Sequence, residues 1–86
     1  MILSGEGLPK QIEVVAYSGY KANERPISFV LDGCERDIEN IIDRWYGVEH
    51  DYFKVVADDG KIYLLRWQRY QDLWFLIKVM ERAGKH

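Results

Sequence analysis

The sequence contains few of the residues that form metal centres and disulfide bonds. Its 86 residues include one cysteine, Cys34, and two histidines, His50 and His86. A single cysteine excludes an internal disulfide and a cysteine-based zinc cage within one chain. A Cys34–His50 nucleophile pair would need a third group to orient it, and none is indicated. We therefore expect no metal, no cofactor, no catalytic residues and no enzymatic activity.

The sequence also has no long apolar run. No stretch approaches the roughly 20 residues that span a bilayer, and the first residues lack the basic and apolar regions of a signal peptide. We expect a cytoplasmic protein without a membrane partner. It should contain one β-rich domain at 11–81, after a flexible lead-in at 1–10 and before a polar tail at 82–86.

Excess positive charge is absent as well. The net charge is −2, which argues against a dedicated nucleic-acid binder. The charge is unevenly placed, because residues 44–86 hold eight basic and six acidic side chains. This half of the chain leaves room for a local basic patch.

Hydrophobic residues make up 48% of the chain and aromatic residues 14%, as in a globular domain. Apolar and polar residues alternate with the period of a β-strand in several short segments, and two Asp-Gly dipeptides, Asp32-Gly33 and Asp59-Gly60, are typical of hairpin turns. The pattern predicts a mainly all-β protein, a small antiparallel, strongly bent sheet or an SH3-like barrel of about five to six strands. The expected strands cover 11–18, 27–31, 34–46, 52–58, 61–67 and 73–80.

The segment 36–46 admits two interpretations. Ile38, Ile41, Ile42 and Trp45 have the spacing of an amphipathic helix, which would make the fold α+β. A bent strand with a bulge near Glu39 also places most of these side chains on one side. The turn at 32–33 and the strands on both sides favour the bulged strand, and the helix remains the alternative.

The hairpin at 52–67 suggests a binding surface. A two-residue turn at Asp59-Gly60 would pair Val56 with Tyr63 and place Phe53, Val55, Ala57, Ile62 and Leu64 on a core face. The opposite face would then be unusually apolar for a solvated surface. We predict a protein-interaction module that binds an unknown protein or itself, with a homodimer as one form. Its candidate residues are Tyr52, Tyr63, Leu65, Trp67 and Trp74.

An alternative function comes from the end of the same hairpin. Arg66, Trp67, Arg69 and Tyr70 interleave cations with aromatic rings, a combination that binds phosphates and stacks bases in small β-barrels. The structural interpretation is that Trp67 pairs with Tyr52 across the strands and that Arg66 lays its stem along a neighbour. A nucleic-acid-binding barrel is therefore the second hypothesis.

The polar loop before Pro26 is a third candidate surface. Tyr20 would be an exposed anchor for a partner, with Glu24 and Arg25 as specificity contacts. In the structural interpretation, Glu24 and Arg25 instead attach the loop to the barrel by hydrogen bonds.

Several motifs also resemble those of a family of short uncharacterised bacterial proteins, a domain of unknown function. The most specific parts are the Tyr-Ser-Gly-Tyr…Glu-Arg-Pro loop at 17–26 and the Asp-Arg-Trp segment at 43–45. The resemblance extends over most of the chain after residue 10. It implies a compact β-rich domain and carries no catalytic or binding residue over to this chain.

Overall fold

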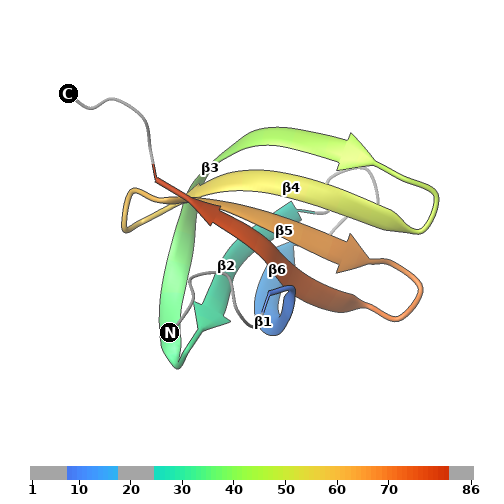
Figure 1. The fold of residues 1–86 in the computed structure, drawn as a ribbon, viewed down its shortest axis with the longest axis horizontal. Helices are drawn as coiled ribbons and strands as arrows, with labels where there is room; N and C mark the ends of the chain where they lie inside the picture. The colour runs from blue at the N-terminus through green and yellow to red at the C-terminus, as the bar shows by residue number, and fades with distance from the viewer. Residues whose placement is uncertain (1–7, 18–24, 82–86) are drawn as a thin grey trace.

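The computed structural model describes residues 8–17 and 25–81, and these form a closed barrel of six antiparallel strands (Figure 1). Each strand pairs with its neighbours in the chain, and β1 also pairs with β6. The prediction of a small all-β barrel is therefore confirmed. The strands are β1 (Lys10–Tyr17), β2 (Arg25–Leu31), β3 (Cys34–Tyr46), β4 (His50–Ala57), β5 (Ile62–Gln68) and β6 (Leu73–Met80).

Two bent strands join the two halves of the barrel. The first residues of β1, 10–12, pair with β6, whereas 13–17 pair with β2. In the same way, residues 34–37 of β3 pair with β2, and 38–46 pair with β4. In Figure 1, β3 rises beside β2 and then turns to run along β4. The result is a broad four-stranded sheet, β3–β4–β5–β6, with β1 and β2 closing its open side.

The ambiguous segment is a strand. β3 covers 13 residues, and the alternative of a helix at 36–46 is wrong. The register of β3 against β4 shifts between Ile38 and Asn40, where the sequence predicts a bulge, and again between Ile41 and Asp43. Each bulge adds one residue to β3, which increases the local twist and bends the strand. Helix-like spacing arose here because two bulges broke a two-residue alternation.

The two Asp-Gly turns differ in geometry. Asp32 and Gly33 both have positive φ, 52° and 82°, as a two-residue type I′ turn requires, and Leu31 pairs with Cys34. At the second turn only Gly60 has positive φ, at 83°. There the amide of Gly60 donates to Ala57 O (2.9 Å) and the amide of Ala57 donates to Lys61 O (3.0 Å). This is a three-residue loop with a glycine bulge.

The longer loop overturns the predicted register of the β4–β5 hairpin. Val56 pairs with Ile62, and Val55 pairs with Tyr63, one residue away from the expected pairing. A shift of one residue moves every side chain of a strand to the other face. Tyr63 and Leu65 therefore enter the core, while Ile62 and Leu64 lie outside it.

The core fills the barrel with apolar side chains from all six strands. A similar exchange of faces occurs in β2, where the register against β1 shifts beside Ile27. Ile27 is consequently exposed, although an unbroken alternation with Phe29 and Leu31 would place it inside. The buried cluster consists of Ile12, Phe29, Phe53, Val55, Ala57, Tyr63, Leu65, Trp74 and Leu76, with partly buried residues such as Leu8 and Ile38 packed against it.

Candidate functional site

The outer face of the four-stranded sheet carries rows of side chains that run across its strands. In one row Trp45 of β3 pairs with Tyr52 of β4, Tyr52 with Arg66 of β5, and Arg66 with Phe75 of β6. Paired residues in adjacent strands point to the same side of a sheet, at a separation of about 5 Å. The Arg66 guanidinium lies 5.2 Å from the centroid of the Phe75 ring. Three aromatic rings and one cation therefore form a continuous row on the outside.

Two further rows complete this surface, which we call the outer sheet face. The second row crosses the same strands and reads Asp43, Lys54, Leu64, Lys78. The third reads Asn40, Val56, Ile62, Met80. Half of these eight side chains are half-buried, and Asn40, Asp43 and Lys78 are exposed.

The outer sheet face is more apolar than a solvated barrel surface requires. Trp45 of β3 is 46% exposed and lies outside the core cluster. Val56 is buried although it lies outside that cluster. Large contiguous apolar patches on small soluble domains mark binding surfaces.

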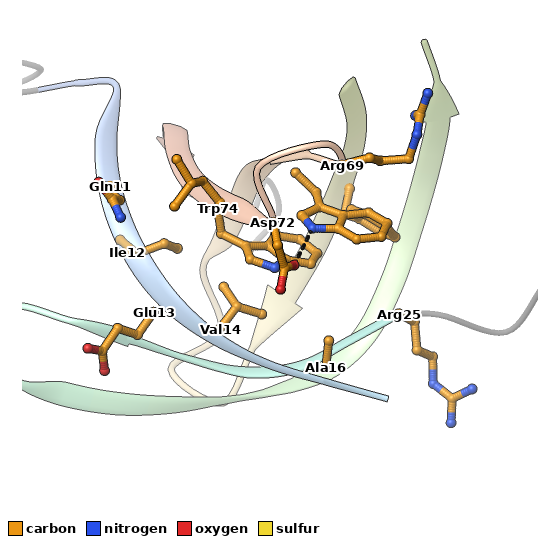
Figure 2. A pocket seen from close by; sticks show the side chains of 12 residues that line it. Gln11, Ile12, Glu13, Val14, Ala16, Arg25, Arg69, Asp72 and Trp74 are labelled. Atoms are coloured by element: carbon orange, nitrogen blue, oxygen red, sulfur yellow. Dashed lines mark hydrogen bonds between the residues drawn. The ribbon is translucent and has the colours of Figure 1, made fainter. Parts of the chain in front are cut away.

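A second candidate region lies at the end of the barrel where β1 leaves β6. Because β1 pairs with β6 only at 10–12, a gap opens between the rest of β1 and the β5–β6 turn. A cavity of about 560 Å³ lies in this gap, and we call it the barrel mouth. Figure 2 shows Ile12, Val14 and Ala16 of β1 directed toward Trp74 on its far side.

Two stacked indoles form one wall of the barrel mouth. The rings of Trp67 and Trp74 are nearly parallel, at an interplanar angle of 13° and a centroid distance of 5.5 Å. Trp67 Nε1 donates to Asp72 Oδ1 over 2.9 Å, which satisfies the indole and fixes its ring (Figure 2). The pair belongs to adjacent strands, β5 and β6, whose register brings Trp67 opposite Trp74.

A buried carboxylate lies beside the mouth and engages two arginines. Asp51 is 2% exposed and accepts a hydrogen bond from Arg69 Nη1, while Arg44 Nη2 lies 3.8 Å from its other oxygen. Arg69 also donates to the carbonyls of Gly47 and Val48. A buried charge must be paired to be tolerated, and Asp51 is paired with two arginines. The contacts of Arg69 also join the β3–β4 loop to the β5–β6 turn. The donors of Arg69 are thus used within the protein.

A smaller polar cluster lies at the β4–β5 turn. Asp59 accepts hydrogen bonds from the Tyr63 hydroxyl (2.6 Å) and the Lys61 amide (2.9 Å), and Arg36 Nε lies 3.7 Å from its carboxylate. Burial alone would raise the pKa of Asp59, but these hydrogen bonds and the nearby cations outweigh it and lower the pKa. Burial, together with the hydrogen bond to the Asp59 carboxylate and its negative charge, raises the pKa of Tyr63 to about 12.

The predicted partner-binding residues are divided between the core and the surface. Tyr63 is 3% exposed and Leu65 is fully buried, and Trp74 is buried beside the mouth. Trp67 is half-buried and stacked on Trp74. Of the five, only Tyr52 lies on the outer sheet face. The doubly apolar hairpin is real, but its outward residues are Tyr52, Val56, Ile62 and Leu64, because the register differs.

The four nucleic-acid candidates do not share one surface. Arg66 lies on the outer sheet face, whereas its neighbour Trp67 points toward the barrel mouth. Arg69 is held by Asp51 and two carbonyls. Tyr70, in the β5–β6 turn, is 77% exposed. Base stacking and phosphate binding by these residues would therefore have to occur on separate sides of the hairpin.

The loop candidates Tyr20 and Glu24 lie outside the described residues. Arg25 begins β2, is exposed, and contributes to the lining of the barrel mouth. The sequence reasoning missed Trp45 and Phe75 as surface residues, and Asp51 as a buried charge. The two-residue alternation that places Phe53 and Val55 inside also places Asp51 on the same face, so a signal for Asp51 was available.

Comparison with known proteins adds no assignment. No protein-family model, curated protein or solved structure matches this chain. The resemblance to a family of short bacterial proteins therefore rests on its motifs alone. Within residues 8–17 and 25–81, no helix is long and apolar enough to cross a membrane. No group of three or more His, Cys, Asp or Glu side chains in the same residues is placed to hold a metal ion.

Proposed function

We propose that this protein is a small non-enzymatic interaction module that binds a protein surface through its outer sheet face. The observation that carries the proposal is the row Trp45, Tyr52, Arg66 and Phe75, which crosses four strands on the outside of the barrel. Aromatic residues and arginine are the side chains that contribute most at protein interfaces.

The barrel mouth supports a structural role better than a binding role. Its Arg69 is engaged by Asp51 and by backbone carbonyls, and its Asp72 is engaged by Trp67. The outer sheet face, by contrast, lies on the outside of the closed barrel. No other strand of the described chain covers its rings.

Site-specific photocrosslinking tests this function. A benzophenone amino acid placed at Tyr52 should form covalent adducts with protein, either another chain or a second copy, when the cells that produce the protein are irradiated. The same amino acid placed at Tyr70, which is more exposed but lies in the β5–β6 turn, is the matched control. Adducts confined to position 52 support the proposal. No protein adduct at 52, or equal labelling at 70, would contradict it.

A further inference from the structure

The rows of the outer sheet face have an order that suits a second copy of the same chain. In the charged row, Asp43 lies on β3 at one side of the sheet and Lys78 on β6 at the other. Both side chains are exposed. In the aromatic row, Trp45 and Phe75 occupy the same two outer positions. The charged row therefore carries opposite charges at its two ends, and the aromatic row carries a ring at each end.

A two-fold axis parallel to the strands, between β4 and β5, brings these ends together. It places β3 of one copy against β6 of the other and keeps each row opposite itself. Trp45 then faces Phe75 of the second copy, and Asp43 faces Lys78 of the second copy. In the middle of the aromatic row, Tyr52 faces Arg66 of the second copy, a cation–π pairing.

We infer that the partner of the outer sheet face is a second copy of this chain, held by a two-fold, face-to-face packing of the β3–β6 sheets. This inference rests on the proposed function and names its partner. Two-fold symmetry requires a self-complementary patch in which each contact occurs twice. Packing of two sheets with their strands within about 30° of each other is the common arrangement for such faces.

The size of the face sets the strength of the dimer. Four strands about 4.8 Å apart, with three outward positions each, cover roughly 400 Å² per copy. A stable interface buries about 800 Å² per partner. The dimer is therefore weak, with a dissociation constant in the micromolar range.

Charge reversal tests the arrangement. Sedimentation velocity of the full chain from about 5 to 500 µM should show the wild type passing from monomer to dimer. Asp43→Lys and Lys78→Asp should each weaken the dimer at least about tenfold, since each places two like-charged pairs at the interface. The double variant Asp43→Lys with Lys78→Asp exchanges the charges and should restore the affinity to within about threefold of wild type.

Glu13→Lys is the matched control, because it makes the same charge change on β1, outside the four-stranded sheet. It should leave the dimer unchanged. A dimer that is indifferent to both single reversals, or that the double variant fails to restore, overturns the two-fold arrangement. A strictly monomeric wild type overturns self-association. In that case adducts of Tyr52 with another protein would still support the proposed function, and their absence would remove it.

Discussion

The two Asp-Gly turns of this barrel share a sequence and differ in shape. At Asp32-Gly33 both residues take positive φ, and the loop has two residues. At Asp59-Gly60 only the glycine does, and the loop has three. A two-residue loop at the second turn would have directed Arg66 into the core along with Ile62 and Leu64. The longer loop keeps Arg66 outside, on the same face as Lys54.

The difference shows how a single loop residue selects the surface of a β-protein. Both faces of β5 are apolar, with Ile62 and Leu64 on one side and Tyr63 and Leu65 on the other. Hydrophobic patterning alone therefore cannot choose between them. The charge of Arg66 and the contact between the Tyr63 hydroxyl and Asp59 favour the observed register, because buried polar groups need partners.

Neighbouring leucines provide the strongest test of this register. Leu65→Ala should lower the free energy of unfolding by about 3 kcal/mol, because it empties a fully buried position. Leu64→Ala, on the outer sheet face, should cost about 1 kcal/mol or less. Urea denaturation at low protein concentration measures both. The two-residue turn would reverse the order of the two variants.

Replacing the aspartates of the two turns should lower the free energy of unfolding by smaller and unequal amounts. Asp59→Gly removes the acceptor of the Tyr63 hydroxyl and the Lys61 amide and should cost about 2 kcal/mol. Asp32→Gly relieves a positive φ and loses only an exposed ion pair with Lys10, so the change should stay within about 0.5 kcal/mol. Equal losses in thermal or urea unfolding would show that the two turns are equivalent after all.

A further expected effect is a loss of stability between about pH 10 and pH 12. The pKa of Tyr63 rises from 10.0 to about 12 in the folded protein. The folded state therefore holds its phenolic proton more tightly than the unfolded state, and stability falls as the pH rises from 10 toward 12. Tyr63→Phe should remove this part of the pH dependence in urea titrations, and Tyr70→Phe should retain it. Identical profiles for the two variants would argue against the Tyr63–Asp59 contact.

The lowered pKa of Asp59 gives stability a pH dependence of the opposite sign. Its contribution to stability is present above the ordinary aspartate pKa of 3.8 and is lost as the pH falls through the lower folded value. In the acid range, Asp59→Gly should therefore lose less stability on acidification than wild type does. Urea titrations of wild type and Asp59→Gly across the acid range measure this difference, and equal losses on acidification would contradict it.

The strands themselves followed from local pattern. Alternation located β1, β2 and β6, and runs of β-branched and aromatic residues located β4 and β5. At 34–46 the preceding Asp-Gly turn and the strands on both sides outweighed the helix-like spacing. The Asp32-Gly33 turn was recognised because the chemistry of a type I′ turn is contained in two residues. The faces of β2 and β5 were not predicted correctly, since a bulge beside Ile27 and an extra residue before Gly60 each exchange inside for outside.

The candidate site was predicted less well than the strands. Tyr52 is the one proposed partner-binding residue that lies on the outer sheet face, and Arg66 lies there as a member of the other hypothesis. Trp45 and Phe75 join them only through pairings across four strands. Such a row has no signature in a linear pattern, because its members are 7 to 14 residues apart and no fixed spacing links them.

Two kinds of information thus determine this protein. Composition, alternation and turn residues act over a few neighbouring positions, so the chain alone shows an all-β domain and the place of each strand. Closure of β1 onto β6, the register of β4 and β5, and the identity of the outer sheet face depend on contacts between distant segments. Those contacts are settled by collective burial, in which one loop residue decides whether a leucine fills the core or lies on the outer sheet face.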